Sequence, residues 1–168
     1  MPISDYLRAV RAKVGHDFLL APAATGLVFD DAGRMLLARH SNAGLWLAPG
    51  GAIDPDESPA DAVVREVWEE TGLHVEPMNI LGVFGGPSFR VRYANGDETG
   101  YVMVVFECRV LGGTPRPDGE EVLELRWVAP DELAAFPLSR WATELLPALV
   151  ASRGRTLLPP VGWRPPTA

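Results

Sequence analysis

Three glutamates in one short segment are the residues of this chain best placed to do chemistry. Glu66, Glu69 and Glu70 stand at positions i, i+3 and i+4, and this spacing places side chains on one face of an α-helix. Like charges held so close repel one another and destabilise the helix. We therefore expect a cation against them, and glutamate oxygens favour a hard divalent ion such as Mg²⁺ or Mn²⁺ over zinc.

The helix that carries these glutamates has clear ends in the sequence. Ser58 is a suitable N-cap, Pro59 suits the first helical position, and Gly72 favours a left-handed stop. The apolar stripe is predicted on the side opposite the carboxylates, and it comprises Val64, Val67, Trp68 and Thr71. Before the helix, Gly50 and Gly51 allow the backbone to approach a metal ion or a phosphate closely, because glycine has no side chain.

The same segment resembles the signature of the Nudix hydrolases. The matching residues are Gly51, Glu57, Arg65, Glu66, Val67, Glu69, Glu70, Gly72 and Leu73. A solvated acidic helix face would not require this spacing on both sides of the glutamates. The resemblance, to MutT-like and ADP-ribose pyrophosphatase-like members, implies the Nudix fold: an α/β/α sandwich with a mixed central sheet.

The resemblance also implies roles for single residues. The implied metal ligands are Glu66, Glu69 and Glu70, together with a carbonyl oxygen of Gly50 or Gly51. Glu57 and Arg65 would support the loop and helix through a charge pair. Glu120 or Glu121, in a loop before a late strand, would supply a further catalytic carboxylate. Because Glu66 could also act as the general base, the identity of the base stays open.

Aromatic and arginine side chains elsewhere could stack a base and bind a phosphate. These candidate substrate-binding residues are Arg39, Phe89, Arg90, Arg92 and Tyr93. An exposed strand face is the alternative for residues 89–93. Trp46 is interpreted as a core aromatic, and His40 as a loop residue, because carboxylates already meet the need for metal ligands.

Composition limits the kind of protein and its partners. The chain of 168 residues suits one domain with a hydrophobic core. A net charge of −7, from 15 basic and 22 acidic residues, argues against a nucleic-acid polymer as partner. No apolar stretch reaches membrane-spanning length, the N-terminus lacks the apolar run of a signal peptide, and Cys108 is the only cysteine. A cytoplasmic location is the expectation.

The chain divides into three predicted parts. Residues 1–22 are an N-terminal extension with a helix over residues 4–13, for packing or homodimer contact. Residues 23–150 form the Nudix domain, in which a strand over residues 101–110 is central and pairs across the Asn95-Gly96 turn with the segment before it. Residues 151–168, rich in Pro and Arg, form an extended arm or a disordered end.

Together these features predict a Mg²⁺-dependent hydrolase that cleaves a phosphoanhydride bond with an activated water. The expected substrate is a small nucleotide, namely a nucleoside diphosphate linked to another group such as ADP-ribose, or a nucleoside triphosphate. The alternatives are a Nudix-fold sensor that binds a nucleotide without cleaving it and, less favoured, a metal-dependent isomerase of the same fold. The intact signature favours the hydrolase.

Overall fold

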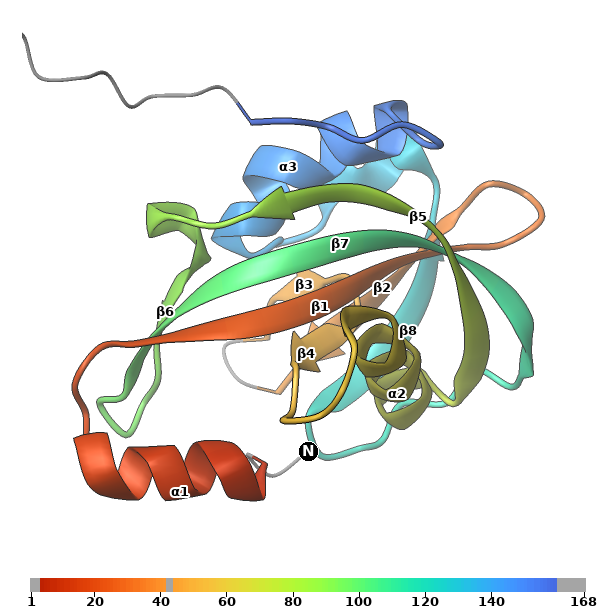
Figure 1. Cartoon of the computed structure of the whole chain (residues 1–168). Helices are drawn as coiled ribbons and strands as arrows, with labels where there is room; N and C mark the ends of the chain where they lie inside the picture. The colour runs from red at the N-terminus through yellow and green to blue at the C-terminus, as the bar shows by residue number, and fades with distance from the viewer. Residues whose placement is uncertain (1–3, 42–43, 160–168) are drawn as a thin grey trace, which may run out of the picture.

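A mixed sheet organises the molecule (Figure 1). The computed structural model describes residues 4–41 and 44–159. The elements in this part of the chain are α1 (Asp5–Val14), β1 (Leu19–Phe29), β2 (Met35–His40), β3 (Trp46–Leu47), β4 (Gly50–Ala52), α2 (Pro59–Thr71), β5 (Leu73–Phe84), the 3₁₀ helix η1 (Pro87–Phe89), β6 (Arg90–Arg92), β7 (Glu98–Gly113), β8 (Val122–Val128), the 3₁₀ helix η2 (Pro130–Ala135) and α3 (Arg140–Ala151).

The strand order is β3-β2-β1-β7-β5, with β4 paired to β1, β6 to β7 and β8 to β2. The pairing of β1 with β7 is parallel and runs the full length of β1. The other pairings, including β5 with β7 and β6 with β7, are antiparallel. The predicted hairpin across Asn95-Gly96 and the central position of its second strand are both confirmed.

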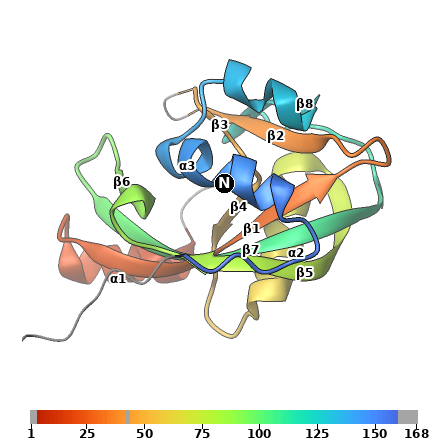
Figure 2. The same ribbon diagram turned by 90° about the horizontal axis from the view of Figure 1, so that it is seen from above.

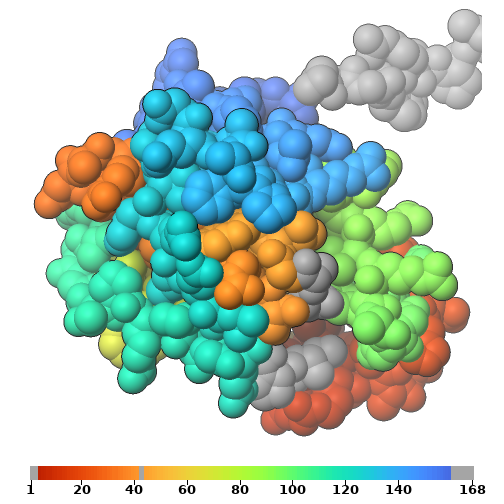
Figure 3. Space-filling view, turned by 180° about the vertical axis from the view of Figure 1, so that it is seen from behind, coloured from red at the N-terminus to blue at the C-terminus, as the bar shows by residue number. Residues whose placement is uncertain are grey.

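Helices cover both faces of this sheet. α2 lies on one side of β1 and β7 and α3 on the other (Figures 1 and 2). Each helix has its own buried apolar cluster, one containing Val63 and Val67 of α2 and the other Leu146 and Leu149 of α3. Seen from behind (Figure 3), the C-terminal elements pack around β2 and β3. The predicted α/β/α sandwich with a mixed sheet is confirmed.

The ends of α2 follow the predicted signals. The Ser58 hydroxyl accepts a hydrogen bond from the Asp61 N–H at 3.1 Å, Pro59 occupies the first turn, and Gly72 ends the helix with φ of 69°. Close packing of α2 on β1 depends on Gly26, because a Cβ there would lie 3.1 Å from both Val63 Cγ2 and Val67 Cγ2.

The predicted apolar stripe of α2 is partly wrong. Trp68 is 55% exposed and Val64 is only half-buried. The buried residues of the helix are Ala62, Val63, Glu66, Val67, Glu70 and Thr71. The prediction placed the buried face opposite the carboxylates. Instead, the backbone at β4 offers them a polar surface, so the buried face is rotated to include two of the three glutamates.

α1 is held at the edge of the sheet by polar contacts. The Ser4 hydroxyl caps it by accepting from the Leu7 N–H at 3.3 Å, and no residue of the helix is buried. Arg11 Nη2 donates to the Glu98 carbonyl at 2.8 Å and to Thr99 Oγ1 at 2.6 Å. The predicted helix is therefore confirmed as an element, and Arg11 ties it to the start of β7.

The segment after α3 runs beside the edge strand β5 (Figure 2). Thr156 Oγ1 donates to the Ile80 carbonyl at 2.9 Å, and the Leu157 N–H donates to the Leu81 carbonyl at 2.6 Å. Residues 160–168 of the predicted arm lie outside the described residues. None of the helices in the described part of the chain is long and apolar enough to span a membrane.

Candidate active site

Two carboxylates of α2 are enclosed between the helix and the Gly50–Ala52 strand. Glu66 is 7% exposed and Glu70 is 2% exposed. The Gly50 N–H donates to Glu70 Oε2 at 3.0 Å. A Cβ at Gly51 would lie 2.5 Å from Glu66 Oε1. The glycine therefore lets this carboxylate lie directly against the backbone.

Gly50 is required by the sheet itself. It pairs with Thr25 and has φ of +155°, and a Cβ there would lie 2.3 Å from the Ala24 carbonyl oxygen. The two adjacent glycines thus serve different contacts, one with β1 and one with the helix carboxylate. Both allow the close backbone approach that the sequence predicts at this point.

Arg65 supplies the positive charge beside the glutamates in this structure. Its Nη1 donates to Glu66 Oε1 at 2.7 Å and to Glu69 Oε2 at 3.1 Å. Its Nε and Nη2 each donate to the Glu57 carboxylate at 2.8 Å, and Nη2 also donates to the Ala52 carbonyl at 3.0 Å. One guanidinium therefore joins the loop, the strand and the acidic face of the helix. Glu69, the exposed member of the trio, lies at the rim.

The buried pair carries an electrostatic cost. Desolvation raises the pKa of Glu70 well above its ordinary value, the charge of Glu66 raises it further, and the bond from Gly50 opposes both. Desolvation also raises the pKa of Glu66, against the opposing contact with Arg65. By contrast, the hydrogen bond from Arg65 lowers the pKa of Glu57. Negative charge is thus confined where water cannot stabilise it.

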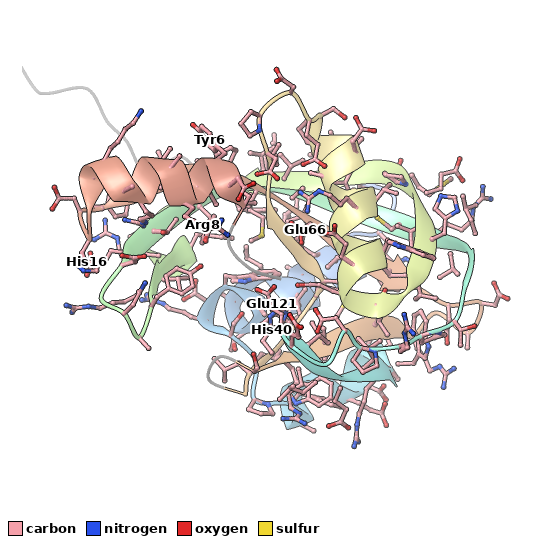
Figure 4. All side chains as sticks on the ribbon, turned by 90° about the horizontal axis from the view of Figure 1, so that it is seen from below. Tyr6, Arg8, His16, His40, Glu66 and Glu121 are labelled. Atoms are coloured by element: carbon pink, nitrogen blue, oxygen red, sulfur yellow. The ribbon has the colours of Figure 1, made fainter. Side chains whose placement is uncertain are left out.

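The loop before β8 adds a further carboxylate, that of Glu121, and Asp118 holds this loop. Asp118 Oδ1 accepts hydrogen bonds from the backbone N–H groups of residues 120, 121 and 122 at 2.9 to 3.0 Å. The Ser41 N–H donates to the Glu121 carbonyl at 2.8 Å. The charge of Glu121 acts on both Glu66 and Glu70, and Figure 4 shows it on the same side of the molecule as Glu66. Glu120, the other candidate in this loop, is exposed.

The interpretation of His40 as a loop residue is wrong. It is the last residue of β2, its side chain is 14% exposed, and its Nε2 lies 3.9 Å from Glu70 Oε1. The signal was the alternation along β2, since Leu36, Ala38 and His40 project from one face and Leu36 packs with the α2 cluster. Burial lowers the pKa of His40, against the opposing charges of Glu121 and Asp118.

The prediction that Phe89 contacts substrate is also wrong. Its side chain is 5% exposed and stacks with Phe84 and Trp141, with ring centroids 6.3 Å and 6.1 Å away. Trp46 is a core residue as predicted, at 6% exposed and edge-on to Phe136. The sequence could not show that η1 would place Phe89 beneath a tryptophan of the distant helix α3.

The other predicted substrate contacts pair with partners outside the carboxylate cluster. Arg39 Nε lies 3.2 Å from Glu124, and Arg92 Nε lies 3.7 Å from Glu98. The Arg90 guanidinium lies 4.5 Å from the centre of the Phe18 ring. The Tyr93 and Tyr101 hydroxyl groups are 2.6 Å apart. The structure therefore does not gather these residues beside Glu66 and Glu70.

The oxygen donors suit a hard divalent ion, although they do not form a closed cage. Within residues 4–41 and 44–159, no three His, Cys, Asp or Glu side chains converge closely enough to hold a metal ion. Glu66 and Glu70 nevertheless present buried carboxylates beside glycine backbone, with Glu69 at the rim. This donor set is the kind that Mg²⁺ and Mn²⁺ prefer.

Comparison with known proteins identifies the family. The NUDIX domain model matches residues 19–149. A MutT-like protein of Streptomyces ambofaciens is 35% identical over 127 residues, which cover 76% of this chain and 75% of the relative. A putative 8-oxo-dGTP diphosphatase of Bacillus subtilis is 34% identical over 110 residues, covering 66% and 67%.

A solved structure agrees with this assignment. An ADP-ribose pyrophosphatase from Streptococcus suis matches with a TM-score of 0.62 and 31% identity, over 80% of this chain and 92% of that one. The chain belongs to the Nudix family. It is a Nudix pyrophosphohydrolase, a hydrolase that acts on acid anhydrides, as the signature between Gly51 and Leu73 predicts.

Proposed function

We propose that this enzyme hydrolyses a phosphoanhydride bond of a nucleoside diphosphate derivative with the help of Mg²⁺, for which Mn²⁺ can substitute. The observation that carries the proposal is the burial of Glu66 and Glu70 side by side. Two neighbouring carboxylates removed from water are unfavourable unless a cation compensates them. Glu66, Glu69 and Glu70 are the proposed ligands, with a carbonyl oxygen of Gly50 or Gly51.

A bound divalent ion would neutralise the charge of the diphosphate. It would also lower the pKa of a bound water molecule toward neutral pH. The residues of the chain hold the ligands in place for that chemistry. The Gly50 N–H fixes one oxygen of Glu70. Arg65, held by Glu57, keeps the loop against the acidic face of α2. Each ligand is thus oriented by a hydrogen bond of its own or by the packing of the loop.

The general base is proposed to be either Glu66 or Glu121. Glu66 lies on α2 and is bonded to Arg65, whereas Glu121 approaches from the loop before β8. A base must be deprotonated in the reactive complex, so its removal abolishes the acidic limb of the pH profile of kcat. Comparing Glu66→Gln with Glu121→Gln in that profile decides between them when Mg²⁺ is saturating, because Glu66 is also a proposed metal ligand.

Two substrate classes are supported by the names of similar proteins. The MutT-like relative and the putative 8-oxo-dGTP diphosphatase favour a nucleoside triphosphate. The solved ADP-ribose pyrophosphatase favours ADP-ribose. A small nucleotide rather than a nucleic-acid polymer also suits a net charge of −7.

A substrate panel tests the proposal. The full chain is incubated with ADP-ribose, dGTP, 8-oxo-dGTP and other nucleoside diphosphate derivatives, with Mg²⁺ or with excess chelator, and the products are resolved by chromatography. We expect a nucleoside monophosphate to be released only when the metal is present. Glu70→Gln is the matched inactive control. Tight nucleotide binding without turnover by any panel member would identify a sensor instead.

A further inference from the structure

Glu70 is a buried carboxylate with one oxygen held by the backbone and the other facing His40. Its Oε2 accepts the Gly50 N–H at 3.0 Å. Its Oε1 lies 3.9 Å from His40 Nε2. A carboxylate that is 2% exposed ordinarily accepts more than one hydrogen bond, because each oxygen has lost its water. A donor to the second oxygen of Glu70 would stabilise the ionised carboxylate.

The nearest nitrogen of His40, Nε2, is buried and lacks a hydrogen-bond partner among the described residues. Buried polar atoms of native proteins are nearly always paired, and an unpaired one calls for an explanation, such as a catalytic role or a bound water or ion. The separation from Glu70 Oε1 exceeds a normal N–H···O hydrogen bond by about 1 Å, so a small side-chain rotation would bring His40 Nε2 within bonding distance of this oxygen.

Backbone hydrogen bonds hold His40 beside the loop that carries Glu121. Where the ladder between β2 and β8 shifts register, the single step from Arg39 to His40 matches two steps along β8 from Glu124 to Val122, so the extra residue lies in β8. The His40 N–H donates to the Leu45 carbonyl at 3.0 Å, and the next residue, Ser41, binds the Glu121 carbonyl. The imidazole is thus carried by the same backbone that positions Glu121, and Figure 4 shows the two side by side.

We propose that His40 is a positioning residue for Glu70 in the loaded enzyme. This inference rests on the proposed function, because it assumes that Glu70 binds the metal. The imidazole donates through Nε2–H to Glu70 Oε1, since an ionised carboxylate can only accept. The negative charges of Glu121 and Asp118 also act on the His40 imidazole, which agrees with a donor role. Hydrogen-bond partners of metal ligands typically contribute about 10- to 100-fold to metal affinity or activity.

Three substitutions of His40 separate this role from simple packing. Gln places a donor near the position of Nε2, Asn places one near Nδ1, and Leu removes the donor. We expect His40→Leu to lower kcat and the affinity for Mn²⁺ by about 10- to 100-fold, with an unchanged KM for the nucleotide. His40→Gln should restore most of both losses, and His40→Asn should not. If the Leu variant does not fold, the contrast between Gln and Asn still decides.

Several outcomes would overturn the proposal. Metal affinity and kcat of His40→Leu equal to those of the wild type would remove the positioning role. A raised KM with unchanged kcat would assign His40 to the substrate rather than to Glu70. Equal losses in Gln and Asn variants would show that ring volume matters and the donor does not.

Failure of the proposed function is recognised separately. Mn²⁺ affinity is measured without substrate, so a wild type that binds metal but turns over no panel member refutes hydrolysis while still testing His40. If the wild type binds no metal, the positioning role fails together with the proposed function, and ¹⁵N NMR of the imidazole in the metal-free protein then tests the contact between His40 and Glu70 alone. We expect an Nε2–H tautomer whose signal shifts in Glu70→Gln, and an unchanged signal would contradict the contact.

Discussion

Arg65 and Glu57 form a fork-to-fork ion pair, with Nε and Nη2 of the arginine each 2.8 Å from one oxygen of the glutamate. Glu57 Oε2 also accepts the Asp54 N–H at 3.1 Å. The remaining guanidinium nitrogen contacts Glu66 and Glu69. This pair fixes the loop that precedes α2, so the positions of Glu66 and Glu69 depend on one planar guanidinium that contacts three glutamates.

Replacing Arg65 by lysine should therefore be far from conservative. An ammonium group cannot bond both oxygens of Glu57 and still reach Glu66. We expect Arg65→Lys to lower the free energy of unfolding by about 1.5–3 kcal/mol, the range for hydrogen bonds to charged groups, and to reduce turnover. Urea unfolding in metal-free buffer measures the first effect. Arg140→Lys, at an exposed pair with Glu144, should change stability by less than about 0.5 kcal/mol, and an equal loss in both variants would contradict this account.

Removing the charge of Glu70 should separate function from stability. Gln retains an oxygen for the Gly50 N–H but carries no buried charge. We expect Glu70→Gln to lose most turnover and to bind metal weakly, while its melting temperature in metal-free buffer equals or exceeds that of the wild type. Thermal unfolding with and without Mg²⁺ provides the measurement. A variant that unfolds without metal would mean that the carboxylate is structural.

The raised pKa of Glu70 also predicts the sign of a pH effect. The folded, metal-free protein binds the Glu70 proton more tightly than the unfolded chain does. Between the ordinary pKa of 4.5 and the raised value, the folded state therefore holds more protons, and stability falls as pH rises. Urea midpoints measured across this range should fall less steeply for Glu70→Gln than for the wild type. Parallel slopes would argue that Glu70 titrates normally.

Asp118 is expected to hold the loop that carries Glu121. Burial opposes its ionisation, but bonds from three backbone N–H groups outweigh this effect and lower the pKa of Asp118. Asp118→Ala should accelerate amide exchange at residues 120–122 and reduce turnover, whereas Asp118→Asn keeps an acceptor oxygen and should change both less. Exchange measured by NMR tests the loop directly. Unaltered protection in the alanine variant would show that other contacts hold it.

The Cys108 thiol should be unreactive in the folded protein. It is 1% exposed, and burial together with the charge of Glu107 raises the pKa of its thiol to about 12. Because the thiolate is the reactive form, a disulfide reagent at pH 8 should label the chain only after denaturant is added. Glu107→Gln should remain unlabelled as well, since burial is the larger cause. Rapid labelling of the native protein would contradict the packing of Cys108 beneath α2.

The sequence by itself determined the features whose causes are local. Ser58 and Gly72 end α2 because capping depends on neighbouring residues. The Asn95-Gly96 turn specified its hairpin for the same reason. Helical geometry places the three glutamates on adjoining positions of one face, and the resemblance of the whole segment from Gly51 to Leu73 to the Nudix signature implied the family and the class of reaction.

Only the tertiary structure decided which face of α2 is buried and what meets it. The approach of β4 turned Glu66 and Glu70 inward and left Trp68 exposed. The fold also places His40 Nε2 3.9 Å from Glu70 Oε1 and stacks the buried Phe89 ring on Trp141. In both pairs the two residues are far apart in the chain. Such contacts depend on how strands pair and helices pack, and a pattern read along one segment carries no information about a distant partner.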